Sequence, residues 1–366
     1  MVFDHRHYVP CLRWKQGEYR AVSRLSRSAK DFITPLIEVP EIGFDFEAQQ
    51  PSRSADHHLG LFVQRIKPKW DRRWCFVDMR LLGSGQVMAD HRHPVRFVFD
   101  KLRSQNCSAV PVVGIDRDRR YRRAVRSAAS RDRRGACLRV SLEDAGRQNL
   151  QKPIDALLGD VALSSEECDF VLDLGAPNFE PVEGFAKLTA GTIQRLPYLR
   201  QWRTFTLMGT SFPGSMAGIE RGSTVIPRSE WVLYKLVSKL LGSRADRLPT
   251  FGDYTINHPD LLSVDMRLVK PSATIRYATD DAWLIVKGRN VRDHKFEQYR
   301  DLCRTVASSP HFCGSEFSTG DQRIALCAAG GGTTGNLSTW REVGTNHHME
   351  KVVRDIANYF GPGGSP

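Results

Sequence analysis

The sequence predicts an α/β protein, a (β/α)8 TIM-like barrel with C-terminal hairpin and helix additions. Short apolar segments of strand length alternate with longer segments whose apolar residues recur at helical spacing. Eight such units fit into about 250 residues, the number and length typical of a closed barrel. Of the 366 residues, 41% are hydrophobic and 26% are charged, so the chain can fill one large core.

The predicted strands are apolar on both faces, as strands of a buried parallel sheet are. They cover residues 8–14, 33–39, 75–79, 109–115, 136–142, 169–175, 204–212 and 250–256. Their alternation with helices implies right-handed crossovers between parallel neighbours. An open doubly wound sheet has the same local pattern, but no glycine-rich phosphate loop follows the first strand, so we favour the barrel.

The pattern changes beyond residue 260. The segment 273–289 predicts two strands joined at Asp280 and Asp281. After it we expect a helix at 294–308, a flexible glycine-rich loop at 328–339 and a last helix at about 347–359. We therefore expect three parts: a barrel core at 1–260, a hairpin and helices at 261–358 that cap it within the same domain, and a disordered tail at 359–366.

Charged residues at or near the ends of the predicted strands are candidates for a functional site, because these ends meet at the barrel mouth. The candidate catalytic cluster consists of Glu38, Asp78, Asp173, Asp253 and His258. Arg139 lies inside the fifth strand, where a charge needs a partner. Pairing of Arg139 with the carboxylates would give a salt-bridged plug. Unpaired carboxylates would instead hold a divalent metal or divide acid and base roles.

Further polar motifs are candidate binding sites. Arg228 opens a helix and either reaches the mouth or stacks on the surface, and WREVGTNHHMEK contributes Arg341, His347 and His348. We expect the two histidines at the entry of the last helix, about 100° apart, so that both do not bind one metal. Ser318 and Asp321 are predicted to cap a helix. The chain contains no H-x-x-x-H, G-x-S-x-G, Walker-type loop or paired C-x-x-C motif.

The net charge of +12 suggests an acidic partner, either a nucleic acid or a protein. Between Asp116 and Arg134 nine arginines face three aspartates. The arginines of this predicted helix either form a solvated face or bind phosphates and carboxylates. The candidates for such a surface are Arg119, Arg120, Arg122, Arg123 and Arg126.

Composition also limits the environment of the chain. No apolar stretch is long enough to span a membrane, and the N-terminus lacks the apolar region of a secretion signal, so we expect a cytoplasmic protein without membrane contact. Most of the eight cysteines lie in or beside apolar segments without metal-binding spacing. We expect them to be buried, reduced thiols.

Several motifs, in this order along the chain, resemble the Beta protein family. They are YVPCLRWKQGEYRAVSRLS, ITPLIEVP, RSEW, FGDYTINHPD, the WLIVKGR hairpin, FSTGD and WREVGTNHH. The family is named for a satellite-phage protein that prevents its neighbour, the killer protein Gop, from killing the bacterial host. The resemblance implies a component of a phage or mobile-element defence cassette, and it implies no set of catalytic residues.

Two functions follow from these observations. In the first, the barrel binds a toxic partner protein encoded nearby, or a phage product, through the basic helix and the cap, and holds the partner inactive. In the second, the chain is a metal-dependent phosphodiesterase or nuclease, in which the mouth carboxylates hold the metal and His258 is the acid or base. Basicity alone does not separate the two, because acidic proteins and nucleic acids both attract arginine.

Overall fold

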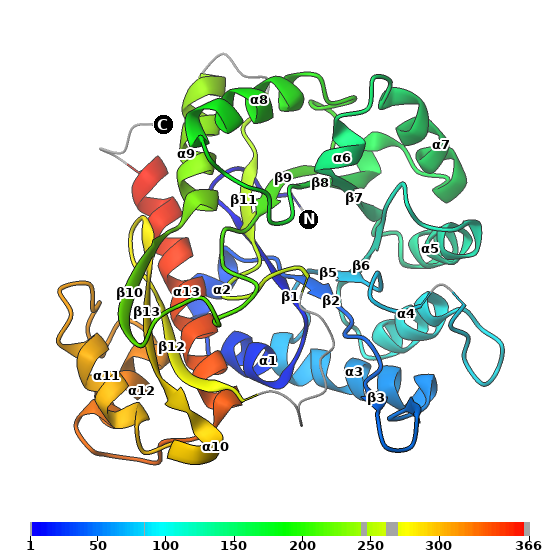
Figure 1. Ribbon diagram of the computed structural model, residues 1–366. Helices are drawn as coiled ribbons and strands as arrows, with labels where there is room; N and C mark the ends of the chain where they lie inside the picture. Colours follow the sequence, from blue (N-terminus) through cyan, green and yellow to red (C-terminus); the bar gives the residue numbers. More distant parts are fainter. Residues whose placement is uncertain (1, 84, 243–246, 261–269, 362–366) are drawn as a thin grey trace.

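The computed structural model describes residues 2–83, 85–242, 247–260 and 270–361. Its core is a closed barrel of eight parallel strands (Figure 1). Around the barrel the strands follow the order β1, β11, β9, β8, β7, β6, β5 and β2. The predicted barrel is therefore confirmed, and the open doubly wound sheet is excluded.

Each barrel strand overlaps a predicted segment and is shorter than that segment. The strands are β1 Tyr8–Leu12, β2 Leu36–Glu38, β5 Cys75–Asp78, β6 Ala109–Val113, β7 Ala136–Ser141, β8 Cys168–Asp173, β9 Thr204–Gly209 and β11 Thr250–Asp253. A small hairpin follows β2 and was not predicted. It consists of β3 Phe44–Asp45 and β4 Gln50–Pro51.

Helices surround the barrel (Figure 1). They are α1 Gln16–Ser23, α2 Arg27–Asp31, α3 Ala55–Trp70, α4 Pro94–Ser104, α5 Arg119–Asp132, α6 Leu142–Ala145, α7 Gln151–Val161, α8 Val182–Gln194 and α9 Ser229–Leu241, with the short 3-10 helix η1 Ser165–Glu167. None of these helices in the described residues has the length and apolar character needed to cross a membrane.

The strands alternate between two apolar cores. Inward side chains fill the barrel, and they are Val9, Cys11, Leu36, Phe76, Val110, Val112, Cys137, Val171, Met208 and Tyr254. Their neighbours along the strands, such as Tyr8, Ile37 and Leu138, pack with the surrounding helices. Because the side chains of a strand alternate in direction, a residue two positions beyond an inward one also faces the interior.

A second sheet lies beside the barrel, at the lower left of Figure 1. Its antiparallel strands, in the order β10, β13 and β12, are Gly222–Pro227, Ala282–Asn290 and Ser272–Ala278. The helices α10 Val291–His294, α11 Tyr299–Ala307 and α12 Thr319–Ala328 follow it in the chain. We call these elements the appendage. The predicted hairpin and its turn are confirmed, whereas β10, which is largely exposed, was not predicted.

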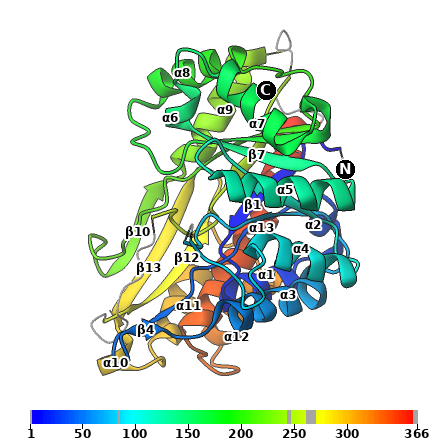
Figure 2. The same ribbon diagram turned by 90° about the vertical axis from the view of Figure 1, so that its right-hand side faces the viewer.

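The last helix, α13 Leu337–Phe360, joins the barrel to the appendage. It contacts α1 and β1 on one side and β12 and α12 on the other (Figures 1 and 2). The contacts are close because glycine stands at two of them. A Cβ on Gly17 would lie 2.9 Å from Cβ of Arg341, and a Cβ on Gly344 would lie 2.8 Å from the carbonyl oxygen of Arg276.

The start of α13 corrects the sequence prediction. The helix begins ten residues before the expected position 347, because the Asn336 side chain accepts a hydrogen bond from the Thr339 amide and caps the helix. The expected loop at 328–339 is correspondingly shorter. Tyr359 and Phe360 belong to α13, and the rest of the expected tail, residues 362–366, lies outside the described residues, as do residues 261–269.

The cysteines are free thiols, as expected. Seven are buried, and Cys313 alone among the eight is exposed.

Candidate functional site at the barrel mouth

A layer of charged side chains lies above the apolar interior of the barrel. Glu38, Asp78, Arg139 and Asp173 each follow an inward-facing apolar residue by two positions. Strand alternation therefore directs them into the barrel at the C-terminal ends of β2, β5, β7 and β8. All four residues are buried, so their charges need compensation within the protein.

Arg139 provides most of this compensation. Its Nη1 donates to Glu38 Oε1 and Asp78 Oδ2, both at 2.8 Å. Its Nε donates to Asp173 Oδ2 at 2.9 Å, and its Nη2 donates to the Tyr254 hydroxyl at 2.7 Å. The Tyr254 hydroxyl in turn donates to Asp173 Oδ2 at 2.7 Å. The pairing of Arg139 with Glu38, Asp78 and Asp173, one of the two alternatives that the sequence left open, is present in the structure.

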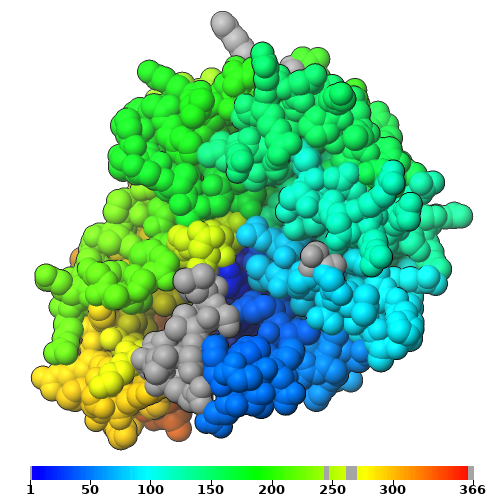
Figure 3. Space-filling view, turned by 45° about the vertical axis from the view of Figure 1, so that its right-hand side comes forward, coloured from blue at the N-terminus to red at the C-terminus, as the bar shows by residue number. Residues whose placement is uncertain are grey.

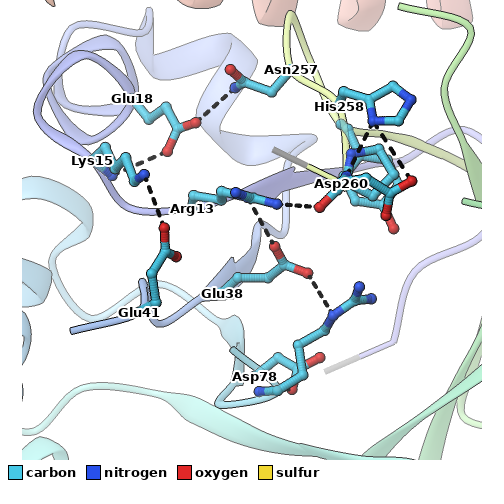
Figure 4. A network of polar contacts seen from close by, with 12 residues as sticks. Arg13, Lys15, Glu18, Glu38, Glu41, Asp78, Asn257, His258 and Asp260 are labelled. Atoms are coloured by element: carbon cyan, nitrogen blue, oxygen red, sulfur yellow. Dashed lines mark hydrogen bonds and ion pairs between the residues drawn. The ribbon is translucent and has the colours of Figure 1, made fainter. Parts of the chain in front are cut away.

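Three more arginines surround the same carboxylates. Nε of Arg13 and Nε of Arg80 lie 3.8 and 3.6 Å from the Glu38 carboxylate, and Arg117 Nη2 lies 3.2 Å from Asp78 Oδ1. Figure 4 shows Arg13 above Glu38, with Asp78 on the other side. We call this set the mouth cluster. It consists of Arg13, Glu38, Asp78, Arg80, Arg117, Arg139, Asp173 and Tyr254.

The ion pairs determine the protonation of Asp78. Burial alone would raise the pKa of this carboxyl group, but Arg117 and Arg139 outweigh burial and hold the pKa below its usual value. Asp78 is therefore ionised at neutral pH. Burial would lower the pKa of Arg139, and Tyr254 together with the carboxylates raises it above its usual value. Asp78 and Arg139 therefore form an oppositely charged pair at neutral pH.

A cavity of about 260 Å³ lies over one side of the mouth cluster. Four arginines and four carboxylates contribute to its wall: Arg80, Arg117, Arg139, Arg147, Asp116, Glu143, Asp144 and Asp173. Figure 3 shows a hollow on one face of the molecule, where green, cyan, blue and yellow segments meet. The balanced wall offers hydrogen-bond donors and acceptors without a strong preference for one sign of charge.

The geometry gives little support to a metal at this mouth. Each carboxylate of the mouth cluster already accepts from, or pairs with, an arginine. A divalent cation would have to displace those guanidinium groups, because it requires the same oxygens. Among the residues that the structure describes, no group of three or more His, Cys, Asp or Glu side chains is placed to hold a metal ion.

Asp253 does not join the mouth cluster. Tyr254 faces into the barrel, so its neighbour Asp253 points outward, toward α13. There Asp253 Oδ1 accepts from the Tyr8 hydroxyl at 2.5 Å, and Oδ2 lies 2.6 Å from His348 Nε2. The sequence interpretation placed Asp253 at the mouth because it ends a strand, and it did not consider on which side of the strand the residue lies.

His258 also makes its contacts elsewhere. Its Nδ1 accepts a hydrogen bond from the Asp260 amide at 3.1 Å, and its ring lies against Gly214. Figure 4 shows His258 beside Asp260, away from Asp78. The Pro-containing turn at 258–260 thus explains the position of this histidine, which has no contact with the mouth carboxylates among those described.

Arg228 lies at the seam between barrel and appendage, neither at the mouth nor on the surface. It is completely buried, and its Nη1 donates to the Thr279 carbonyl at 2.8 Å and pairs with Asp355 at 3.0 Å. Its guanidinium also lies over the rings of Trp231 and Trp283, at 5.8 and 5.7 Å. Arg228 therefore joins α9, the hairpin turn and α13.

The two adjacent histidines lie in the middle of α13 and are fully buried. His347 Nδ1 lies 2.8 Å from Asp321 Oδ2, and its Nε2 lies 2.8 Å from the carbonyl of Ala278. His348 contacts Asp253 on the opposite side. The expected angular separation is thus present, but the expected position at the helix entry is wrong.

Other motif residues complete this seam. Ser318 caps α12, as predicted, by accepting from the Asp321 amide. Arg341 Nη1 donates to Asn257 Oδ1 at 2.9 Å, and Asn257 Nδ2 donates to Glu18 Oε1 at 2.7 Å. The family-like motifs of the sequence therefore meet mainly along α13.

The basic helix α5 carries a different kind of charge. Its apolar face, formed by Tyr121, Ala124, Val125, Ala128 and Ala129, is buried against the barrel. Arg122 pairs with Asp160 at 2.8 Å. The other predicted arginines, Arg119, Arg120, Arg123 and Arg126, are exposed and form no ion pair with the described residues. We call these four residues the arginine face.

Sequence reasoning missed Arg13, Arg80, Arg117 and Tyr254 as parts of the mouth cluster. Strand alternation could have predicted two of them. Arg13 stands two positions after the inward-facing Cys11, and Tyr254 stands two positions after Gly252, which is also an inward position. Arg80 and Arg117 lie in loops, where no periodicity predicts direction.

Fold and site together define a (β/α)8 barrel whose mouth is closed by ion pairs and whose last helix carries an α/β appendage. The chain belongs to the Beta protein family, whose sequence pattern matches residues 8–354. None of the curated proteins matches the sequence significantly. Among solved structures, a glycoside hydrolase family 5 enzyme from Prevotella bryantii B14, in complex with a xyloglucan tetradecasaccharide, is similar with a TM-score of 0.33 and 9% identity. This alignment covers 69% of the present chain and 83% of the enzyme.

Proposed function

We propose that this Beta family protein is the binding component of a phage or mobile-element defence cassette, and that it restrains a toxic partner protein encoded nearby. The arginine face of α5 carries the proposal. It would dock an acidic surface of the partner, with the appendage as a second contact. Sensing of a phage product through the same surfaces is the variant of this function in which the acidic partner comes from the phage.

The arginine face is electrostatically unfavourable in the free protein. Arg119 and Arg123, like Arg120 and Arg123, stand at spacings where equal charges repel along a helix. Arg119 and Arg120 also lie in the first turn, where the helix dipole disfavours cations, and this turn contains no acidic residue. Four cations within about 10 Å of helix thus have no described internal partner, and an acidic surface would supply one.

The contrast with neighbouring arginines supports this argument. On α4, Asp100 pairs with Arg92, Arg96 and Arg103, and also with Arg131 at the end of α5. A single carboxylate thus compensates several arginines where the function is structural. Guanidinium groups bind carboxylates and phosphates in two-point fashion, so an uncompensated set suits an acidic protein surface or a nucleic acid.

Co-expression with the toxic product of the adjacent gene tests the proposal. We expect the wild-type chain to co-purify with that product and to rescue growth. Reversal of Arg120, Arg123 and Arg126 to Glu should abolish both effects. The matched control reverses Lys152, Lys187 and Lys239, which are exposed, lie outside both α5 and the appendage and make no described ion pair, and it should retain both.

Two outcomes would contradict the proposal. In one, the wild-type chain never co-purifies with the product and cells die regardless. In the other, the arginine-face variant protects as well as the wild type. If the purified wild type instead cleaves nucleic acid with added Mg²⁺ or Mn²⁺, and Asp78→Ala and Asp173→Ala abolish cleavage, the metal-dependent nuclease hypothesis replaces the present one.

A further inference from the structure

A second cavity lies in the appendage and shares no wall residue with the cavity at the barrel mouth. Its volume is about 450 Å³. Strands β12 and β13, the first residues of α13, Tyr299 of α11 and the loop at 215–217 form its wall. Cavities of about 300–1,000 Å³ accept small organic ligands, and the volume therefore allows a ligand of nucleotide size.

The described wall of this cavity carries cations and no carboxylate. The cations are Lys270, Arg276, Lys287 and Arg341. The described hydrogen bonds of three of them go to neutral groups. Arg276 Nη1 donates to the Ile256 carbonyl at 2.9 Å, Lys287 Nζ donates to carbonyls of the loop before β10, and Arg341 donates to the Asn257 amide oxygen.

The electrostatics of Arg276 show the lack of compensation. Burial and the nearby charge of Arg341 lower the pKa of Arg276 to about 9, which leaves it positively charged at pH 7. Glu18, which is not part of the cavity wall, is joined to Arg341 through the Asn257 amide and compensates its charge in part. Burial raises the pKa of Glu18, and the charge of Arg341 opposes this rise. Positive charges held together in this way favour an anion between them.

Two further features of the wall fit a phosphate-bearing ligand. Leu337 and Ser338, the first two residues of the 24-residue helix α13, line the cavity, so the positive end of the helix dipole lies there. Tyr299 and Trp340, which stack on each other at 4.5 Å and 4°, contribute apolar surface to the wall. The wall thus offers cations for a phosphate and apolar surface for the group attached to it.

We propose that the appendage cavity binds a small ligand with a phosphate group, of nucleotide size. Arg276 and Arg341 would hold the phosphate together with the start of α13, and Lys270 would add charge at the rim. A phosphate fits better than a single carboxylate, because it carries up to two negative charges and offers three oxygens to several donors. The site is separate from the arginine face of α5 and does not depend on the proposed partner.

Calorimetric titration of the full chain tests this proposal, with ADP, inorganic pyrophosphate and adenosine as probes. We expect ADP and pyrophosphate to bind and adenosine not to bind. Arg276→Gln should weaken ADP binding about tenfold to a hundredfold, the effect of one lost charge-assisted hydrogen bond. Arg289→Gln is the matched control, because Arg289 is an exposed arginine of β13 outside the cavity wall, and it should bind like the wild type.

Lys270→Gln keeps the test decisive if Arg276→Gln fails to fold, because Lys270 is exposed and its replacement leaves the core intact. It should also weaken ADP binding. Absence of binding by both phosphate probes would overturn the proposal, as would equal binding of adenosine. Equal weakening by Arg289→Gln, or loss of binding on charge reversal of the α5 arginines, would assign the signal to general surface charge and would overturn it as well.

Discussion

The barrel mouth and the appendage cavity contain similar numbers of cations, but their charges are balanced differently. At the mouth, Arg139 and three other arginines surround three carboxylates. In the appendage, Arg276 and three other cations share a wall without a described carboxylate. The cations of the mouth cluster pair with carboxylates of the barrel, whereas Arg276, Lys287 and Arg341 of the cavity donate to neutral groups and keep their positive charge. The partners of the arginines, rather than their number, therefore distinguish a structural cluster from a candidate binding site.

Removal of Arg139 should have the largest effect on stability. Arg139→Met leaves Glu38, Asp78 and Asp173 buried without their main partner, and we expect a loss of about 3–5 kcal/mol in the free energy of unfolding. Denaturant unfolding of both proteins measures the change. Arg289→Met, an exposed control, should stay within about 0.5 kcal/mol of the wild type. Equal stability of Arg139→Met and the wild type would show that the mouth cluster is not a structural plug.

Much of the barrel was predictable, because its strands are encoded by local runs of apolar residues. The charged plug was also predictable, since an arginine inside an apolar strand requires nearby acids. Asp253 was misplaced because the direction of a strand-end residue depends on the register of its neighbours, and in this strand Tyr254 takes the inward position. Arg228, His347 and His348 were misplaced for another reason. Their surroundings come from contacts between α13 and the appendage, and these involve residues up to about 130 positions apart.

In the appendage, too, contacts between segments distant in the sequence were not predicted. Its hairpin was predicted from two strand-like segments and a turn, but β10 pairs with β13 from a distant place in the sequence. Largely exposed residues with few apolar side chains give no clear strand signal. The cavity was not predictable, because residues of β12, β13, α11 and α13 come together only after these elements have packed.

The close contact between α13 and β12 leaves no room for a side chain at Gly344. Gly344→Ala would place a Cβ 2.8 Å from the carbonyl oxygen of Arg276, and backbone cannot move away as a flexible side chain does. We expect a loss of about 1–3 kcal/mol in the free energy of unfolding, together with weaker ADP binding, because Arg276 moves. Gly60→Ala is the matched control. Its Cβ meets nothing within 4 Å inside helix α3, so it should gain about 0.5–1 kcal/mol. If Gly344→Ala has the same free energy of unfolding as the wild type, α13 is not packed tightly against β12 at this position.

The seam and the mouth cluster should lose stability in different pH ranges. Burial lowers the pKa of His348 below 6.5; Arg228 and His347 add to this effect, and Asp253 opposes it. Nδ1 of His348 is buried and has no hydrogen-bond partner among the described residues, as suits an unprotonated nitrogen. Because the folded-state pKa is lowered, His348 contributes stability above about pH 6.5, and this is lost as the pH falls toward the folded-state value. Asp78, whose pKa is also lowered, loses its contribution only below about pH 4.

Unfolding measurements between pH 4 and pH 8 test this separation. The slope for one proton is at most about 1.4 kcal/mol per pH unit. His348→Gln should reduce the loss of stability between about pH 6.5 and 5, and His294→Gln, at an exposed position, should not. Other histidines with a lowered pKa, such as His7 at about 4, contribute equally to all three proteins. If the curves of His348→Gln and the wild type are parallel, His348 does not titrate in this window.

Replacement of Arg276, which has no carboxylate partner in the cavity wall, should have the smallest effect on the free energy of unfolding. Arg276→Gln removes a charge that Arg341 repels, and it also removes a hydrogen bond to the Ile256 carbonyl. The two contributions oppose each other, so we expect the free energy of unfolding to change by about 1 kcal/mol or less. The same type of residue would then be essential to stability at the mouth and nearly neutral in the appendage. If Arg276→Gln destabilises the protein as much as Arg139→Met does, Arg276 has a structural partner, and the distinction between the two regions fails.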